Sequence, residues 1–519
     1  MNASRPIALC RVLTALLWGV LLAGCASLPS LEGREMSWAI SEAEARETRL
    51  GRGLFKLTDS HPGLSGIHSL LDAHDAFAAR MSLARAAERS LDIQYYIWRN
   101  DMTGTLLFEA LHAAADRGVR VRLLLDDNNT KALDSTLAVL DSHANIEVRL
   151  FNPFLLRSVR TVGFIADFSR ANRRMHNKSW TVDNLATIVG GRNIGDEYFG
   201  ADDILFTDLD VLAVGAVVRD VSQDFDRYWG SASAYPAALI LPEAPEEGLA
   251  LLAAASSLVE RDPAAAAYVE ALRASRFVTE LVQGRLNFEW AKTRLVSDSP
   301  AKGLGRTSRV DRVTGQIAEA IEGPTKRMDM VSPYFVPTER GVASFVALAD
   351  AGVKVRVLTN SLDATDVAAV HSGYARYRKA LLKAGVTLYE MRRLGPEPEE
   401  RPKAGPFGSS GSSLHAKTFA VDGRQLFIGS FNFDPRSARL NTELGFVIDS
   451  PALTRRLHRT FDRHIPPLAY QVLLDENGRL YWLEQHKGRE IRHRSEPRTP
   501  LWKRVKVWIL SLLPIESLL

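Results

Sequence analysis

One short pattern of polar residues occurs twice in this chain, and it constrains the fold more than any other feature. In each copy a His and a Lys two residues apart are followed by an Asp seven residues after the His and an Asn seventeen residues after it. The members are His176, Lys178, Asp183 and Asn193 in the first copy and His415, Lys417, Asp422 and Asn432 in the second. Four residue types at four matching offsets indicate an internal duplication, so we expect two related halves.

The duplication extends upstream of the motif. The matching segments are 91–98 with 328–335, 116–125 with 350–358, and 146–150 with 386–390. Each half reads as strand, helix, strand, helix, strand and motif, with glycine caps at Gly118, Gly352 and Gly385 ending helices. This alternation predicts an α/β fold in which each lobe has a mostly parallel sheet flanked by helices. Two such lobes, packed about a pseudo-twofold axis, bring both motifs into one active site at their interface.

The remaining segments complete a domain plan. We expect a signal peptide at 1–24, a tether and lead-in helix at 25–60, lobe 1 at 61–235, a helical connector at 236–325, lobe 2 at 326–465, a hairpin and basic segment at 466–498, and an amphipathic helix at 499–519. A chain of 519 residues is long enough to bury a core in each lobe.

The basic character of the chain is local. Residues 485–506 hold eight Lys or Arg and two Glu, so they carry +6, and the other 497 residues sum to −2 within the total of +4. The lobes therefore lack the general excess of positive charge that favours nucleic-acid binding. We expect no nucleic-acid partner.

The N-terminus resembles a bacterial lipoprotein signal. Arg5 and Arg11 precede an apolar run at 12–22, too short to span a bilayer, which ends in Leu-Ala-Gly-Cys25. Cleavage before Cys25 leaves that thiol to be acylated, and two or more acyl chains anchor a protein stably. The other cysteine, Cys10, lies in the removed segment. A mature body without thiols excludes disulfides, zinc-thiolate sites and cysteine nucleophiles.

Each motif reads as a hairpin. The first strands, 175–182 and 414–421, place His and Lys on one face, since residues two apart in a strand share a face. Asp183 and Asp422 lie at an odd offset and at a turn, so they are better suited to hold the hairpin or support the site than to touch substrate. The glycines that follow bring Asn193 and Asn432 back beside the His and Lys.

A histidine in catalysis needs a carboxylate to orient it. A Thr-acid-Leu element follows each motif, and its acids are Asp208 and Glu443. We predict these two residues as the acids behind the two histidines.

This set of groups suits a phosphodiester. Two lysines and two asparagines can donate to the phosphate oxygens and stabilise the charge of the transition state. One imidazole can attack phosphorus, forming a phosphohistidine, while the other protonates the leaving alcohol and then deprotonates the incoming one. Because the ammonium groups supply the positive charge, we expect neither a metal nor another cofactor.

The duplicated motif, His-x-Lys-x4-Asp-x6-Gly-(Gly/Ser)-x-Asn, resembles the signature of the phospholipase D superfamily, over roughly residues 60–465. Within it, the runs at 91–98 and 123–129 are similar to bacterial cardiolipin synthases, and those at 172–178, 190–195, 430–437 and 440–443 are most similar to the C type. The resemblance implies phospholipase D-like lobes, with His176 favoured as the nucleophile. It implies transfer of a phosphatidyl group from phosphatidylethanolamine or phosphatidylglycerol onto phosphatidylglycerol. The lipoprotein signal departs from a generic synthase, and from it we expect a monomer anchored as a lipoprotein facing the periplasm of a Gram-negative bacterium.

Three features favour lipid over DNA as the substrate. The first is the lipoprotein anchor. The second is the apolar stretch 151–164, which either admits acyl chains or belongs to the core. The third is the segment 501–513, whose Leu and Trp residues share a helical face opposite Lys and Arg, so that it either lies in an anionic interface or docks on the body. The alternatives that remain are a hydrolytic phospholipase D, a nuclease and a non-catalytic membrane scaffold.

Overall fold

The computed structural model describes residues 27–201, 208–273, 277, 280, 285–393, 414–486 and 488–519. The predicted signal peptide, 1–24, and the predicted lipidation site, Cys25, lie outside these residues. Among the helices that are described, none is long and apolar enough to cross a membrane.

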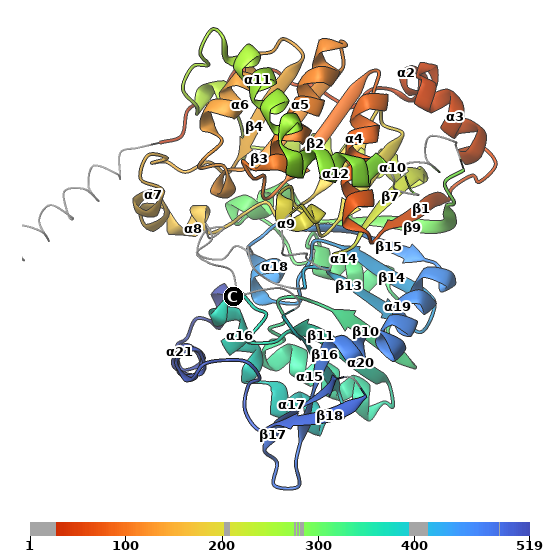
Figure 1. The fold of residues 1–519 in the computed structure, drawn as a ribbon, viewed down its shortest axis with the longest axis vertical. Coiled ribbons are helices and arrows are strands. Elements are labelled where there is room, and N and C mark those ends of the chain that lie inside the picture. The colour runs from red at the N-terminus through yellow and green to blue at the C-terminus, as the bar shows by residue number, and fades with distance from the viewer. Residues whose placement is uncertain are drawn as a thin grey trace, which may run out of the picture.

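The chain folds into two lobes, one above the other in Figure 1, each built on a β-sheet. In lobe 1 the order of neighbouring strands is β9, β1, β7, β6, β5, β2, β3, β4, β8. These strands are β1 (Ser65–Leu70), β2 (Ser90–Tyr95), β3 (Arg120–Asp126), β4 (Ile146–Phe151), β5 (Ser179–Val182), β6 (Ala186–Gly190), β7 (Asp210–Gly215), β8 (Ala234–Pro236) and β9 (Glu289–Ser297).

Lobe 2 repeats this arrangement and extends it. Its order is β9, β15, β14, β13, β10, β11, β12, β16, β17, β18. The strands are β10 (Arg327–Val331), β11 (Lys354–Asn360), β12 (Thr387–Met391), β13 (Thr418–Val421), β14 (Gln425–Gly429), β15 (Leu444–Asp449), β16 (Ala469–Leu474), β17 (Leu480–His486) and β18 (Arg489–His493). The turn between β16 and β17 forms the hairpin predicted within 466–498.

The predicted α/β architecture is confirmed, with one correction to the strand directions. The strand-helix-strand units do form parallel triplets, β2–β3–β4 in lobe 1 and β10–β11–β12 in lobe 2. Every other pairing between the strands named above is antiparallel, because the motif hairpins and the strands that follow them join the same sheets. Each sheet is therefore mixed, not mostly parallel.

The predicted helical connector at 236–325 also contains a strand that the sequence reading missed. Residues Glu289, Trp290 and Ala291 of β9 pair with β1 of lobe 1, and the rest of β9, from Lys292, pairs with β15 of lobe 2. A single strand thus continues from one sheet into the other and fixes the two lobes relative to each other.

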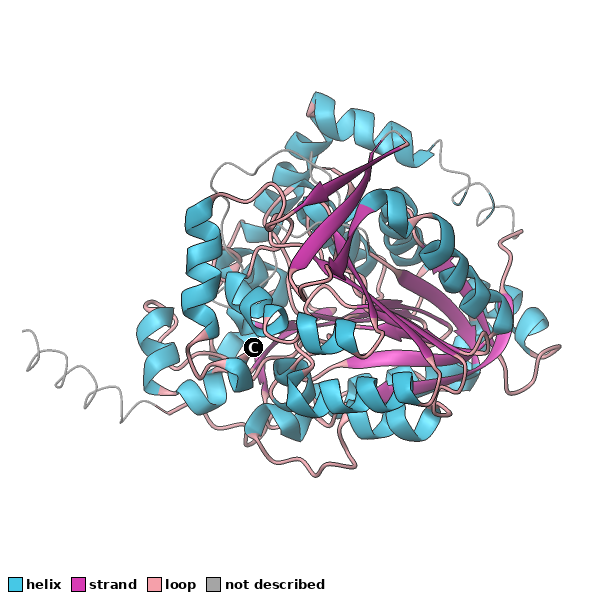
Figure 2. Ribbon diagram, turned by 90° about the horizontal axis from the view of Figure 1, so that it is seen from below, coloured by secondary structure: helices cyan, strands magenta, loops and turns pink. Residues whose placement is uncertain are grey.

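Helices cover the outside of the sheets (Figure 2). Those before β9 are α2 (Glu42–Glu47), α3 (Arg49–Thr58), α4 (Ala73–Ala86), α5 (Met102–Asp116), α6 (Asp134–Asp141), α7 (Arg160–Ala166), α8 (Phe168–Ala171), α9 (Asp196–Phe199), α10 (Ala216–Trp229), α11 (Gly248–Arg261) and α12 (Pro263–Arg273). Those after it are α14 (Val313–Ala320), α15 (Thr338–Asp350), α16 (Ala368–Ala375), α17 (Arg378–Lys383), α18 (Pro435–Arg439), α19 (Pro451–Arg463), α20 (Ile465–Leu468) and α21 (Leu501–Ser511). Short 3₁₀ turns are η1 (Asp127–Asn129), η2 (Ala237–Leu239), η3 (Pro300–Leu304) and η4 (Glu516–Leu518).

The glycines predicted to end helices do so. Gly118 follows α5, Gly352 follows α15 and Gly385 follows α17, with φ of 88°, 81° and 88°. This left-handed conformation favours glycine and lets the chain turn from each helix into the next strand.

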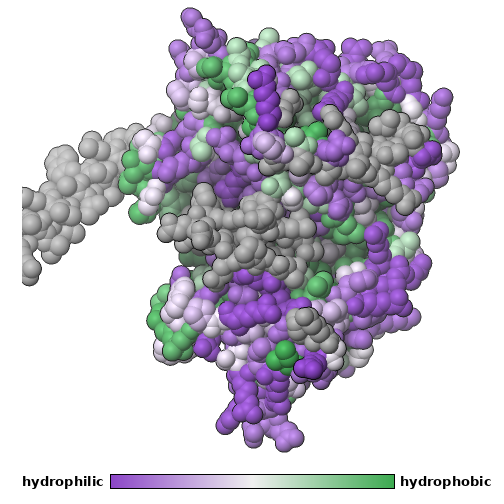
Figure 3. All heavy atoms as spheres, viewed as in Figure 1, coloured by the Kyte–Doolittle hydropathy of each residue, from purple (hydrophilic) through white to green (hydrophobic). Residues whose placement is uncertain are grey.

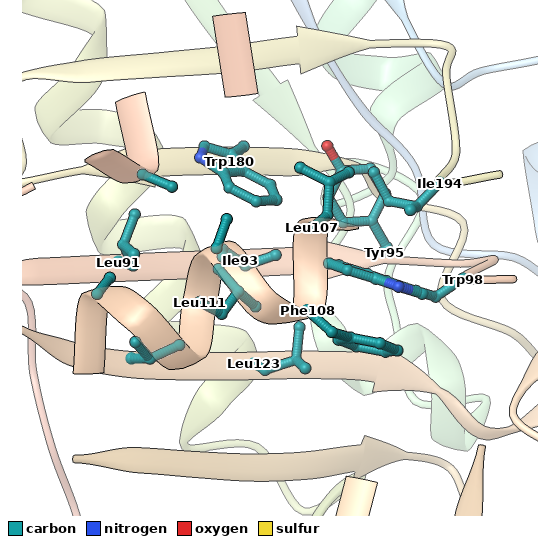
Figure 4. Close-up of a cluster of buried hydrophobic side chains, with 14 of the residues drawn as sticks. Leu91, Ile93, Tyr95, Trp98, Leu107, Phe108, Leu111, Leu123, Trp180 and Ile194 are labelled. Carbon is teal, nitrogen blue, oxygen red and sulfur yellow. The ribbon is translucent and has the colours of Figure 1, made fainter. Parts of the chain in front are cut away.

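The core of lobe 1 lies between α5 and the parallel strands (Figure 4). Trp98 stacks on Phe108 with ring centroids 4.4 Å apart, and its indole N–H donates to the Gly104 carbonyl at 3.1 Å. Leu91, Ile93 and Leu123 of β2 and β3 complete this face and are fully buried. The packing holds rigid the carboxyl ends of the strands, where the first motif begins.

Duplication extends to buried polar contacts that the sequence reading missed. In each lobe an arginine on the second parallel strand pairs with an aspartate on the first strand and with an aspartate on the helix that follows the motif. These residues are Arg122, Asp92 and Asp226 in lobe 1 and Arg356, Asp329 and Asp462 in lobe 2. A buried arginine with two carboxylate partners ties sheet to helix in the same way in both lobes.

Candidate active site

The two histidines of the motif are each bound to an acid from the opposite lobe. His176 Nδ1 lies 2.7 Å from Glu443 Oε2, and His415 Nδ1 lies 2.6 Å from Asp208 Oδ2. Glu443 stands just before β15 of lobe 2, and Asp208 just before β7 of lobe 1. Each acid predicted from a Thr-acid-Leu element therefore contacts the histidine of the other lobe.

This pairing sets the proton positions on both rings. A carboxylate accepts a hydrogen bond, so Nδ1 of each imidazole carries the proton and Nε2 presents a lone pair. The rings are further held by edge contacts with tyrosines, Tyr96 against His176 at 5.0 Å and Tyr198 against His415 at 5.3 Å between centroids. Each histidine is thus oriented as a nucleophile or base toward the space between the lobes.

Burial decides the charge of these groups. It lowers the pKa of His176 to about 4 and that of His415 to about 3, so both imidazoles are neutral near pH 7. Despite burial, the histidine beside each acid and the nearby lysines hold the pKa of Asp208 and of Glu443 below its usual range. The arrangement is two neutral imidazoles backed by two carboxylates.

The two lysines lie inside the same buried cluster. Lys178 Nζ donates to the carbonyl of His176 at 2.5 Å, and Lys417 Nζ donates to the carbonyl of His415. Burial lowers the pKa of both lysines, that of Lys417 to about 8, although the carboxylates of Asp208 and Glu443 oppose this shift. Among the described residues each ammonium makes this one hydrogen bond, which leaves two of its three donors for a ligand.

The motif asparagines differ in their contacts. Both polar atoms of the Asn193 amide are bonded, since its Oδ1 accepts from the Ile97 N–H at 3.2 Å and its Nδ2 donates to the Tyr198 hydroxyl at 3.2 Å. Asn432 lines the same cavity, and its buried Oδ1 has no hydrogen-bond partner in the described part of the chain. Both lie beside the histidines.

The motif aspartates occupy the hairpin turns between β5 and β6 and between β13 and β14, the position that their odd offset from the histidines predicts. Asp183 accepts from the N–H groups of Glu88, Arg89 and Ser90 at 2.8–3.0 Å. Asp422 accepts from those of Thr325, Lys326 and Arg327 at 2.7–2.8 Å. They tie each hairpin to the start of the first parallel strand.

The predicted motif strands are also shorter than expected. Their ladders begin at Ser179 in β5 and Thr418 in β13, after the His-x-Lys segments. Instead of pairing inside lobe 1, the His176 N–H donates to the Thr442 carbonyl of lobe 2 at 2.9 Å. The His-x-Lys segment of lobe 1 is thereby hydrogen-bonded to lobe 2.

The small residues of the motif stand directly beside the acids. A Cβ on Gly191 would lie 2.2 Å from Oδ1 of Asp208, so only glycine fits there. At the equivalent place in lobe 2, the Ser430 hydroxyl donates to Oε2 of Glu443 at 2.5 Å. Glycine thus makes room for the acid in one half, and serine binds the acid in the other.

A second layer of charges supports the acids. Behind Asp208, Arg192 donates to its carbonyl and Asp210 pairs with Arg80 at 2.7 Å. Behind Glu443, Asp298 Oδ2 accepts its backbone N–H at 2.9 Å and pairs with buried Lys302 at 2.8 Å. These supports differ, so the acids of the two half-sites are held by unrelated contacts.

The histidines face one cavity of about 20 Å³, enough for about one water molecule. Sequence reasoning missed Tyr96, Tyr198 and most of the other lining residues, because the same residue type does not recur at the matching positions of the other half. The lining is Tyr96, Ile97, His176, Asn193, Tyr334, His415, Asn432, Asp434, Arg436, Ser437 and Asn441. Burial raises the pKa of Asp434 to about 7, which makes it a further titratable group at this wall.

One cluster elsewhere has the residue types of a metal site. His112, Asp116 and His143 have side-chain atoms within 4.8 Å of one another. However, Nδ1 of His143 accepts the Asn145 N–H at 3.0 Å, so its Nε2 carries the proton that it shares with Asp116 at 3.2 Å. A protonated Nε2 has no lone pair for a cation, so this cluster is explained by its own hydrogen bonds.

Comparison with known proteins agrees with this geometry. A family model described as cardiolipin synthase, phospholipase D-like domain, matches residues 81–229 and 317–465. Cardiolipin synthase C of Escherichia coli K12 is 51% identical over 91% of this chain and all of its own length. Cardiolipin synthase A of Pseudomonas fluorescens is 26% identical over 82% of this chain and 71% of its own.

The fold has a counterpart among solved structures. The phosphatidylserine synthase of Haemophilus influenzae matches 91% of this chain and all of its own with a TM-score of 0.56, at 14% identity. With both halves of the chain matched by one family model, the chain belongs to the phospholipase D-like cardiolipin synthase family and is an enzyme of the phosphatidyltransferase class.

Proposed function

We propose that this enzyme moves a phosphatidyl group from phosphatidylethanolamine or phosphatidylglycerol onto phosphatidylglycerol, making cardiolipin through a phosphohistidine. The observation that carries the proposal is the crosswise pair of neutral imidazoles, each backed by an acid of the other lobe and both facing one cavity. The buried ammonium groups of Lys178 and Lys417 supply positive charge for the phosphate.

The reaction takes two displacements. Nε2 of His176 attacks phosphorus, the bond to the leaving alcohol breaks, and His415 gives that alcohol its proton. In the second step a phosphatidylglycerol hydroxyl gives its proton to His415 and attacks phosphorus, and the bond to His176 Nε2 breaks. The negative charge of a bound phosphodiester raises the pKa of the adjacent imidazole, which favours the proton that His415 carries at the start.

The lipid surface as partner is supported by two exposed apolar patches. On α21, the exposed side chains are Leu501, Trp502, Val505, Trp508, Ile509 and Leu512, while Val507 is buried against the body. Around α7 and α8, the exposed side chains are Val159, just before α7, with Val162 and Ile165 on α7 and Phe168 on α8. Both patches lie at the left edge of the molecule in Figure 3, one from each lobe.

These patches also refine the two readings of the C-terminal helix. The helix docks on the body through Val507, but it turns its apolar face, including Trp502 and Trp508 at 66% and 62% exposure, away from the protein. Exposed Trp and Leu beside Lys503, Arg504 and Lys506 suit the interface of an anionic bilayer. We propose that α7, α8 and α21 rest on the membrane.

An anchor at Cys25 is compatible with this orientation. The N-terminal end of the described chain, drawn in red, leaves the body at the same edge (Figure 1). Arg34 donates to the carbonyls of Gly230, Ser231 and Ala234 at 2.7–2.8 Å, so the chain is fixed to the body nine positions after the proposed lipidation site. We propose a periplasm-facing lipoprotein that works as a monomer, since one chain supplies both half-sites.

The test is a product assay. Incubate the purified protein with phosphatidylglycerol vesicles, with and without phosphatidylethanolamine and in chelator, and identify products by mass. We expect cardiolipin; phosphatidic acid alone would support the hydrolytic alternative, and a requirement for added metal would contradict the mechanism. His176→Ala and His415→Ala should each lower turnover by at least about 10³-fold. His464→Ala, which changes an exposed histidine, is the matched control.

A trapping experiment tests the order of the histidines. The donor carries a label on its phosphatidyl group and has a leaving group that needs no proton. His415→Ala should then accumulate the labelled phosphatidyl group on His176, and His176→Ala should accumulate none. Label found on His415 in the His176→Ala variant would reverse the assignment.

A further inference from the structure

Three arginines from distant parts of the chain line a second pocket, which we call the arginine pocket. They are Arg173, just after α8; Arg312, just before α14; and Arg439, at the end of α18. The pocket holds about 340 Å³ and is completed by Gly305, Thr307, Leu440, Ser517 and Leu518. It lies where the C-terminal end of the chain, marked in Figure 1, meets both lobes.

The positive charge of this pocket has no carboxylate partner within the described part of the chain. Among the residues that the structure describes, none of the three arginines forms an ion pair with a carboxylate, and Arg173 donates only to the carbonyl of Arg439, at 3.3 Å. The Nε of Arg312 is buried without a hydrogen-bond partner in the same set of residues. Burial and the charge of Arg312 both lower the pKa of Arg173. An anion in the pocket would relieve this repulsion.

Gly305 has no side chain and so leaves space beside the Arg173 guanidinium. Gly305 has φ of +73°, which favours glycine, and a Cβ there would come within 3.3 Å of three guanidinium atoms of Arg173. A larger residue at 305 would therefore press on the group that faces the pocket.

The pocket is adjacent to the catalytic cavity. Arg173 is three residues before His176, and Arg439 and Leu440 directly precede Asn441, which lines that cavity. The segments run side by side, since the Thr442 N–H donates to the Arg174 carbonyl and the His176 N–H to the Thr442 carbonyl, both at 2.9 Å. Three residues of extended chain span at most about 10 Å. That span is of the order of a phospholipid headgroup.

We propose that the arginine pocket binds the phosphate of the acceptor lipid, phosphatidylglycerol, while the terminal hydroxyl of its glycerol enters the cavity between the histidines. The proposal rests on the function proposed above and adds the site that selects the acceptor. Phosphodiester oxygens accept paired hydrogen bonds from guanidinium groups, and water has no phosphate to bind. The pocket would thus favour transfer over hydrolysis.

The decisive experiment compares an acceptor that has a phosphate with one that has none. Initial rates are measured with one acyl-labelled donor lipid, whichever the wild-type protein uses, and either phosphatidylglycerol or isotope-labelled glycerol as acceptor. The variants are Arg312→Gln and Arg439→Gln. Arg309→Gln, which changes an exposed arginine outside the pocket, is the matched control.

We expect each pocket variant to slow transfer to phosphatidylglycerol about 10- to 100-fold, the loss of one charge-assisted hydrogen bond. Rates with glycerol should stay within about twofold of wild type, which also shows that the variants fold. Glycerophosphoglycerol should compete with phosphatidylglycerol in the wild type and far less in the variants.

Three results would overturn the subsite. Equal loss with both acceptors would show a structural role, and no loss with either would show that the pocket does not hold the acceptor. Inhibition of the variants by glycerophosphoglycerol as strong as that of the wild type would place the phosphate elsewhere. A wild-type protein that makes no cardiolipin would defeat the proposed function itself, and the subsite with it.

Discussion

The two half-sites have the same hairpin but different surroundings. In both, an aspartate at the turn accepts three backbone N–H groups, and a lysine donates to the carbonyl of its own histidine. The acids differ, since lobe 1 supplies Asp208 beside Gly191 and lobe 2 supplies Glu443 beside Ser430. The contacts that both half-sites share position the histidine. The acids and their neighbours, which differ between the half-sites, orient its ring.

The difference shows that similar motifs need not be interchangeable. Glu443 has one more methylene than Asp208 and takes a second hydrogen bond from Ser430, while Asp208 fits against a glycine without a Cβ. Because each acid serves the histidine of the other lobe, a change in one lobe acts on the opposite histidine. The following predictions test this comparison.

The largest effect should come from removing the charge of either acid. Asp208→Asn and Glu443→Gln present an amide N–H or a weaker acceptor to Nδ1, which disturbs the tautomer that leaves Nε2 free. We expect cardiolipin synthesis to fall about 10³- to 10⁴-fold in each, as in the comparable His–Asp pair of serine proteases.

The control for this pair is Glu319→Gln, an exposed acid at 76% side-chain accessibility. In the trapping assay, Glu443→Gln should block formation of the phosphohistidine. Near-normal turnover in Asp208→Asn with loss of turnover in Glu443→Gln would contradict the prediction that both histidines need their acid.

Exchanging the small residues should give unequal losses. Gly191→Ser places a Cβ 2.2 Å from Oδ1 of Asp208 and should push that acid off His415, with a loss of about 100-fold or more. Ser430→Gly removes one hydrogen bond to Glu443, worth about 1–2 kcal/mol, so we expect about a tenfold loss. Steady-state rates measure both, and equal losses would refute the proposed difference between the half-sites.

The pH profile should reveal the buried lysine of lobe 2. A lysine is charged below its pKa, so Lys417, with a pKa of about 8, loses its ammonium as pH rises through 8. We expect kcat/KM to fall up to tenfold per pH unit above that point. Lys417→Arg keeps the charge and should move this fall to higher pH; a wild-type profile flat to pH 10 would contradict the assignment.

The turn aspartates should affect stability more than chemistry. Asp183→Asn and Asp422→Asn each place an amide against three backbone donors, which we expect to cost about 1–3 kcal/mol in unfolding free energy. Asp183 is fully buried and should cost more than Asp422. Thermal melts measure the loss, and turnover per folded molecule should stay within about threefold. A loss of turnover without loss of stability would instead indicate a catalytic role for these two aspartates.

Much of the site was predictable from the sequence because it repeats. The offsets within each copy identify His176, Lys178 and Asn193 with their partners in lobe 2, and the Thr-acid-Leu elements identify Asp208 and Glu443. Strand β9 was not predictable because it has no counterpart in the repeat, and the tyrosines Tyr96 and Tyr198 were not predictable because the matching positions in lobe 2 hold Pro333 and Ser437. The mixed sheets were missed because nothing in the alternation of strands and helices reports how a following hairpin joins the sheet.

The sequence predicted the duplicated lobes, the phosphodiester chemistry and the residues proposed to perform it, since these predictions depend on residue types at short, fixed spacings. The tertiary structure alone decided which acid serves which histidine, over separations of 267 and 207 residues. It also decided that three remote arginines share one pocket. Both depend on how the lobes pack, and packing is a property of surfaces assembled from the whole chain.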